Sequence, residues 1–187
     1  MMMNYRTEII EKTIPTEEFV ARFVDVEKFL GYCRECSGYN VSCSCPPYDF
    51  DPRDYWRAYE KVKIVGVKIL FDEGDVGKTV DHEEWIAIQR EILHKEADKL
   101  YVLLKEEEIV TEGSCLLNAG NCRLCGDKGC DRRKHKCRQP KLRRYSIESL
   151  GGNVAAVASE LLGFDLQWIE EGKLPPYLTQ IGGMLYK

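Results

Sequence analysis

The sequence predicts an α+β fold, in which helices pack on a mostly antiparallel sheet and two cysteine-rich metal-binding loops lie at one end. The expected elements follow the order strand, helix, loop, helix, strand, helix, strand, loop, helix, strand, strand, which suggests helices on one face of a sheet. All but one of the nine cysteines fall in two short stretches. The length of 187 residues and the 44% apolar content suit a single domain over residues 1–187.

The N-terminal part is expected to lead from a strand to the first cysteine loop. Tyr5–Ile14 is rich in β-forming residues, which favours a strand. Thr16 is expected to cap a short helix that continues through Val26–Leu30. The loop that follows ends in Cys45-Pro46-Pro47, where the prolines stop regular structure.

The middle of the chain predicts a helix and the clearest strand. Asp51 and Pro52 are typical of the cap and the first position of a helix. Its buried side is expected to consist of aromatic residues, namely Tyr55, Trp56 and Tyr59. Val62–Phe71 combines β-branched residues with alternating lysines, which predicts a strand.

The longest helix is expected to begin at Asp81, with Glu84 as its capping-box partner, and to reach about residue 105. Apolar residues recur at the helical period, at Trp85, Ile88, Ile92, Leu93, Ala97, Leu100 and Leu104. Glu106–Glu108 is interpreted as a solvated run of charges. Ile109–Leu117 is expected to return as a strand into the second cysteine loop.

The C-terminal part predicts one more helix and two strands. Asn153 is expected to cap a helix over Val154–Leu162 that ends at Gly163. Leu166–Ile169 and Leu178–Tyr186 are interpreted as strands.

Composition narrows the classes of function. The net charge of −4 and the pI near 5.5 argue against a general nucleic-acid-coating protein. The start of the chain lacks the basic and apolar regions of a secretory signal, and no apolar run is long enough for a membrane span. We therefore expect a cytoplasmic protein without a membrane partner. An odd number of cysteines in such a chain favours metal ligation over a disulfide framework.

The first cysteine stretch contains the pattern C-x2-C-x8-C-P at Cys33, Cys36 and Cys45. A C-x2-C pair turns two sulfurs toward one metal ion or one corner of a cluster. The fourth ligand stays open among Cys43, Cys115 and a group from outside the chain. An iron site with a free position would suit substrate binding or chemistry.

The second stretch, Asn121–Pro140, has the pattern C-x2-C-x4-C-x6-C, formed by Cys122, Cys125, Cys130 and Cys137. Thiolates are natural ligands of zinc and of iron–sulfur clusters, whereas calcium and magnesium need oxygen ligands. The zinc alternative reads C-x2-C-x4-C-x4-H, with His135 as the fourth ligand.

This second stretch is also basic. Its cations could meet nucleic-acid phosphates, or offset the negative charge of thiolate-bound metal. They are Arg123, Lys128, Arg132, Arg133, Lys134, Lys136 and Arg138, followed directly after the stretch by Lys141, Arg143 and Arg144. No stacking aromatic residue interleaves them, and Tyr145 stands only at the edge, so a nucleic-acid partner is disfavoured.

Several motifs occur together along the chain, namely Cys33-x2-Cys36, Tyr39, Cys45-Pro46-Pro47, Ala119-Gly120-x-Cys122-Arg123-Leu124-Cys125, Cys137-Arg138-x-Pro140 and Arg144-x-Ser146-x-Glu148-x-x-Gly151. In these motifs the chain resembles a bacterial and archaeal family of cysteine-rich, predicted metal-binding proteins of unknown function. The resemblance spans most of the chain. It implies that the metal ligands are Cys33, Cys36, Cys45, Cys122, Cys125, Cys130 and Cys137.

The chain departs from the family pattern at two places. Cys43 stands where the pattern has an aromatic residue, and the gap between Cys125 and Cys130 is longer. The family supplies no agreed reaction, so catalytic residues are not assigned.

Two hypotheses follow. The favoured one is an iron–sulfur protein with one or two [4Fe–4S] clusters and a redox or accessory role in anaerobic metabolism, whose candidate partner is a redox protein. The other is a zinc-stabilised module whose basic loop contacts nucleic acid or an acidic partner. The first predicts that the two cysteine loops lie next to each other, because electron transfer or a shared substrate requires both within reach.

Overall fold

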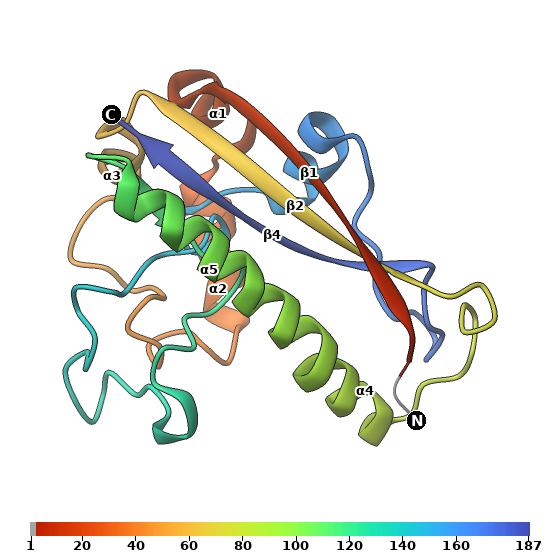
Figure 1. Ribbon diagram of the computed structural model, residues 1–187. Coiled ribbons are helices and arrows are strands. Elements are labelled where there is room, and N and C mark those ends of the chain that lie inside the picture. Colours follow the sequence, from red (N-terminus) through yellow and green to blue (C-terminus); the bar gives the residue numbers. More distant parts are fainter. Residues whose placement is uncertain (1–2) are drawn as a thin grey trace.

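The computed structural model describes residues 3–187, apart from the side chain of Asp127. Its centre is an antiparallel sheet with the strand order β1-β2-β4-β3 (Figure 1). The strands are β1 (Tyr5–Pro15), β2 (Lys61–Phe71), β3 (Cys115–Leu117) and β4 (Tyr177–Tyr186). The antiparallel sheet with its helices confirms the α+β class.

The helices are α1 (Thr16–Phe23), α2 (Val26–Glu35), α3 (Pro52–Arg57), α4 (His82–Ile88), α5 (His94–Val110) and α6 (Val154–Ala156). A π-helical turn over Gln89–Leu93 joins α4 to α5, and another over Val157–Leu162 extends α6. Short 3-10 helices cover Gly126–Lys128 and Glu148–Leu150. The caps expected at Asp51, Asp81 and Asn153 are present, because these side chains accept backbone N–H groups in their first turns.

Helices cover both faces of the sheet, so the expectation of helices on one face is wrong. Strand β2 explains the difference, since it is buried along most of its length. Val62 and Ile64 pack toward α1, α3 and the α6 region, while Val67 and Ile69 pack toward α4 and α5. In Figure 1 the long α4–α5 helix crosses one face, and α1 lies behind the other.

The strand expected at Ile109–Leu117 is mostly helix. Helix α5 continues to Val110, and only Cys115–Leu117 pairs with β4. The side chains of Ile109 and Val110 are 73% and 81% exposed. Their apolar character therefore does not reflect burial in the sheet.

Glu106–Glu108 is not a freely solvated charge run, because two of its members have specific partners. Glu107 bonds to Lys63 and to the hydroxyl of Tyr186. Glu108 is bound by Arg144, at 2.6 Å between Arg144 Nε and Glu108 Oε1. These partners lie on other elements, which is why the local sequence does not reveal them.

Glu108 should make stability depend on pH below neutrality. Burial by itself raises the pKa of Glu108, but hydrogen bonds from Arg144, Lys105 and the backbone N–H of Leu116 outweigh it and lower the pKa below 4.5. The stabilisation is then complete above the unfolded-state pKa and is lost as pH falls through the lowered folded-state pKa. Urea unfolding between pH 7 and about pH 3 should show a weaker pH dependence for Glu108→Gln than for the wild type. If the free energy of unfolding changed equally with pH in the two proteins, Glu108 would not be the source of the pH dependence.

Near the N-terminus, two local expectations are wrong. Thr16 is the first helical residue and not a cap, since its Oγ1 is buried without a hydrogen-bond partner in the described residues. Helices α1 and α2 are separate, because the side chain of Asp25 caps α2 by accepting the N–H of Lys28 at 3.0 Å. Helix α2 then carries Cys33 within its last turn.

Leu166–Ile169 does not form the expected strand. Leu166 packs against the core on one face of the sheet, and Ile169 packs against the core on the other. The apolar residues of this segment therefore serve packing, and β4 alone follows it as expected.

Candidate metal centre

The two cysteine segments, residues 33–47 and 119–145, lie side by side at one side of the molecule, at lower left in Figure 1. The backbone N–H of Arg132 donates to Val41 O at 2.8 Å, and the N–H of Cys43 donates to Cys130 Sγ at 3.2 Å. The guanidinium of Arg132 also donates to Cys45 O at 2.8 Å. The expectation that the loops are neighbours is confirmed by these contacts.

The first group of thiols consists of Cys33, Cys36 and Cys45. Helix α2 positions Cys33 in its last turn and Cys36 as its C-terminal cap, while the prolines after Cys45 hold the end of the loop. Burial, followed by the nearby thiols of Cys45 and Cys36, raises the pKa of Cys33 to about 11. Cys36 Sγ accepts the N–H of Gly38 at 3.4 Å. Gly38 adjoins Cys45 as well, since a Cβ built on it would lie 3.5 Å from Cys45 Sγ, so Cys36 and Cys45 lie on either side of one glycine.

The second group brings Cys43 together with thiols of the second segment. Burial, followed by contacts with Cys130 and Cys137, raises the pKa of Cys43 to about 12. Burial likewise raises the pKa of Cys122, and the thiols of Cys125, Cys130 and Cys137 add to it. Cys43, considered from the sequence as a fourth ligand of the first group, thus lies against the second.

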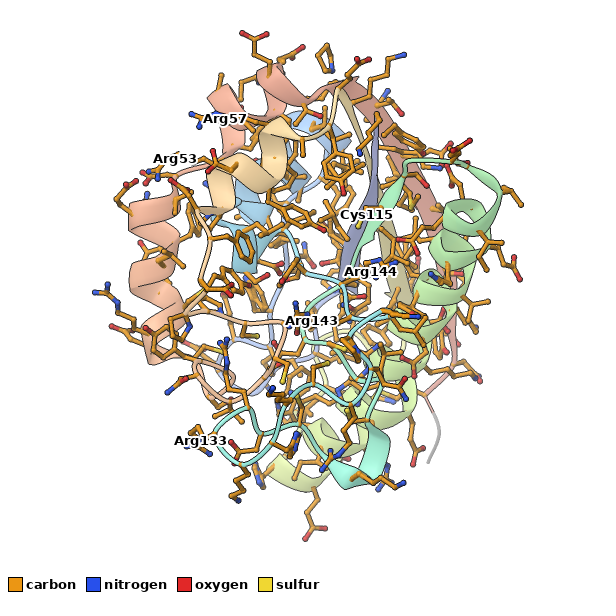
Figure 2. The ribbon with its side chains drawn as sticks, turned by 90° about the vertical axis from the view of Figure 1, so that its left-hand side faces the viewer. Arg53, Arg57, Cys115, Arg133, Arg143 and Arg144 are labelled. Atoms are coloured by element: carbon orange, nitrogen blue, oxygen red, sulfur yellow. The ribbon has the colours of Figure 1, made fainter. Side chains whose placement is uncertain are left out.

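Cys115 lies apart from both groups. It occupies strand β3, where its Sγ is 3.1 Å from the hydroxyl of Tyr55. Figure 2 shows it on the sheet, above Arg144 and well away from Arg133 on the loop. In the described part of the chain, the Cys115 thiol therefore contacts the aromatic core and no other thiol.

Asn121 is a residue that sequence reasoning did not single out. Its Oδ1 accepts from the thiol of Cys45 at 3.2 Å, so it connects the second segment to the first thiol group. Gly38 makes room for this contact, since a Cβ there would lie 3.2 Å from Asn121 Nδ2. Its position directly before Cys122 is the only sequence signal that pointed to it.

Many of the basic side chains fasten the second segment instead of projecting freely. Arg123 pairs with Asp98, Arg133 pairs with Asp131, and Arg138 donates to Gly129 O at 2.6 Å. His135, the alternative zinc ligand, has its Nε2 3.3 Å from the N–H of Asp131 and its Nδ1 2.9 Å from Lys136 O. Neither ring nitrogen of His135 contacts a thiol in these bonds.

The donor chemistry of the two groups fits a metal that prefers sulfur. All nine cysteines are free thiols, and the ligands that would hold metal are drawn from them alone. Among the side chains that the structure describes, no three from Cys, His, Asp or Glu converge tightly enough to hold a single metal ion. The fit therefore rests on the kind of donors and on their grouping.

A family model matches most of the chain. The model of the family described as "Predicted metal-binding protein (DUF2284)" matches residues 14–185. No curated protein and no solved structure matches the chain. In the described part of the chain, every helix is too short or too polar to cross a membrane.

Proposed function

Because the chain belongs to the DUF2284 family of predicted metal-binding proteins, we propose that its two cysteine segments bind iron–sulfur, as one or two [4Fe–4S] clusters. The observation that carries the proposal is the grouping of eight free thiols from two neighbouring segments. Cysteine thiolates are the usual ligands of such clusters. Four thiolates would suffice for one zinc ion, so the larger set of thiols favours an iron–sulfur cluster over zinc.

In this proposal the ligands are Cys33, Cys36 and Cys45 in the first segment and Cys122, Cys125, Cys130 and Cys137 in the second. An iron–sulfur cluster supplies one-electron chemistry when bound, which suits a redox or accessory role in anaerobic metabolism and a redox partner protein. The guanidinium groups of Arg132 and Arg143 donate to the backbone carbonyls of Cys45 and Cys43, and these bonds help to position the first cysteine segment.

Anaerobic purification tests the proposal directly. The protein should be brown, absorb broadly in the visible blue, lose its colour with dithionite, and contain iron and acid-labile sulfide. A colourless protein with stoichiometric zinc and no sulfide would overturn the proposal. That outcome would support the zinc-stabilised module, although Arg123 and Arg133 are already paired with carboxylates and leave less charge for nucleic acid.

A further inference from the structure

A pocket of about 360 Å³ opens next to the second group of thiols. It lies where the first cysteine segment meets the end of the second. Its lining consists of Cys43, Pro47, Tyr48, Asp49, Arg132, Arg143 and Tyr145. The wall therefore combines a buried thiol, two guanidinium groups and two aromatic rings.

Both guanidinium groups at this pocket are held by neutral oxygens. Arg132 Nη1 donates to Cys45 O at 2.8 Å and to Pro47 O at 2.7 Å. Arg143 Nη1 donates to Cys43 O at 3.2 Å. Neither arginine forms an ion pair with any carboxylate whose side chain the structure describes. These carbonyl bonds orient the cations without neutralising them, which leaves positive charge at the pocket.

Tyr145 adds an oriented hydroxyl to these cations. Its Oη accepts from Arg143 Nη2 at 2.9 Å, so its own hydrogen is free to donate elsewhere. The hydroxyl of Tyr48 is already used, since it donates to Ser44 O at 2.8 Å. The ring of Tyr48 meets that of Tyr145 edge-on, with centroids 5.1 Å apart, and forms an aromatic wall.

The charge balance favours a small anion over a large polyanion. Asp49 is an exposed carboxylate in the same lining, so two positive groups are opposed by one negative group. The volume is at the lower end of small-molecule sites. Guanidinium and hydroxyl donors recognise carboxylate and phosphate oxygens, and the aromatic wall suits an organic body.

We propose that this pocket binds a small organic anion through its carboxylate or phosphate group. Cys43 lies in the wall of the pocket and against Cys130 and Cys137, so the bound anion would lie beside the metal centre. Small organic anions would then be the class of substrate on which that centre acts. The substrate role rests on the proposed function, whereas binding of the anion itself does not.

Isothermal titration of the anaerobically purified protein tests the pocket, with sodium benzoate and sodium phosphate as separate probes at constant chloride. Arg143→Gln should weaken binding about tenfold or more, because it removes a charge-assisted contact. Tyr145→Phe keeps the ring and should weaken binding by a smaller factor. Arg133→Gln is the matched control, since Arg133 pairs with Asp131 and points outward from the loop in Figure 2, and it should leave affinity unchanged.

The outcomes separate the claims. Binding of benzoate alone assigns a carboxylate, binding of phosphate alone assigns a phosphate, and binding of both assigns general oxyanion recognition. The proposal of an anion-binding pocket would be overturned if neither probe bound, or if Arg133→Gln lost as much affinity as Arg143→Gln. If Arg143→Gln does not fold, unchanged affinity in Tyr145→Phe would overturn it instead. Arg143-dependent binding in a protein without iron and sulfide would overturn only the proposed cluster.

Discussion

Replacing Cys125 with serine should remove iron and sulfide from the second cysteine segment. Serine keeps its proton at neutral pH and does not replace a thiolate ligand of an iron–sulfur cluster. With two clusters, iron and sulfide per chain should fall by about half, and with one cluster they should fall nearly to zero. Iron, sulfide and zinc analysis of anaerobically purified protein measures the change, together with the visible absorption.

Cys115→Ser is the matched control for this experiment. The Cys115 thiol contacts the hydroxyl of Tyr55, and a serine hydroxyl is able to form the same hydrogen bond. Metal content should therefore equal that of the wild type. If Cys115→Ser removed all metal, the grouping of the thiols would be wrong, and the two segments would share one centre with Cys115 among its ligands.

The regular elements were largely predictable because their signals are local. The capping box of Asp81 and Glu84 lies within one turn, and the β-branched run of β2 needs no distant partner to be recognised. The predicted end of helix α5, at about residue 105, is too early because the contacts of its last turns are not local. Glu107 and Glu108 are held by Lys63, Tyr186 and Arg144, which are far away in the chain.

In the candidate metal site, too, the local features were predictable from the sequence and the long-range contacts were not. Spacing alone suggests that Cys33 and Cys36 act together, because a short loop brings their sulfurs to one place. Spacing does not reveal that Cys43, two residues before Cys45, lies against Cys130 of the second segment. Cys43 contacts Cys130, whereas Cys45 contacts Asn121, and both contacts depend on how the second segment packs against the first.

The ion pair of Arg144 and Glu108 joins the end of the second cysteine segment to helix α5. It is bidentate, with Arg144 Nε and Nη2 at 2.6 Å and 3.0 Å from the two carboxylate oxygens. The side chains are 18% and 5% exposed, respectively. Glu108 Oε1 also accepts the N–H of Leu116 in β3 at 2.8 Å, so one carboxylate connects helix, strand and loop.

Arg144→Met should lower the free energy of unfolding by about 3 kcal/mol, measured by urea unfolding at pH 7. The loss arises because Glu108 stays buried with one partner fewer, and it falls at the lower end of the usual range since Lys105 still binds that carboxylate. The double variant Glu108→Gln/Arg144→Met should be less destabilised than Arg144→Met, because a glutamine oxygen can still accept from Leu116 without carrying charge.

Arg133→Gln is the control for Arg144→Met, because it removes the charge of an arginine whose ion pair is exposed and not buried. The pair of Arg133 with Asp131 has similar geometry, at 2.8 Å, but the Arg133 side chain is 56% exposed. Exposed pairs contribute little to stability because water screens their charges, so this variant should unfold nearly as the wild type does. Equal stability of Arg133→Gln and Arg144→Met would show that Arg144 contributes no more than a surface cation. A larger loss in Arg144→Met would instead assign it the anchoring of the second cysteine segment, on which both the proposed metal site and the anion pocket depend.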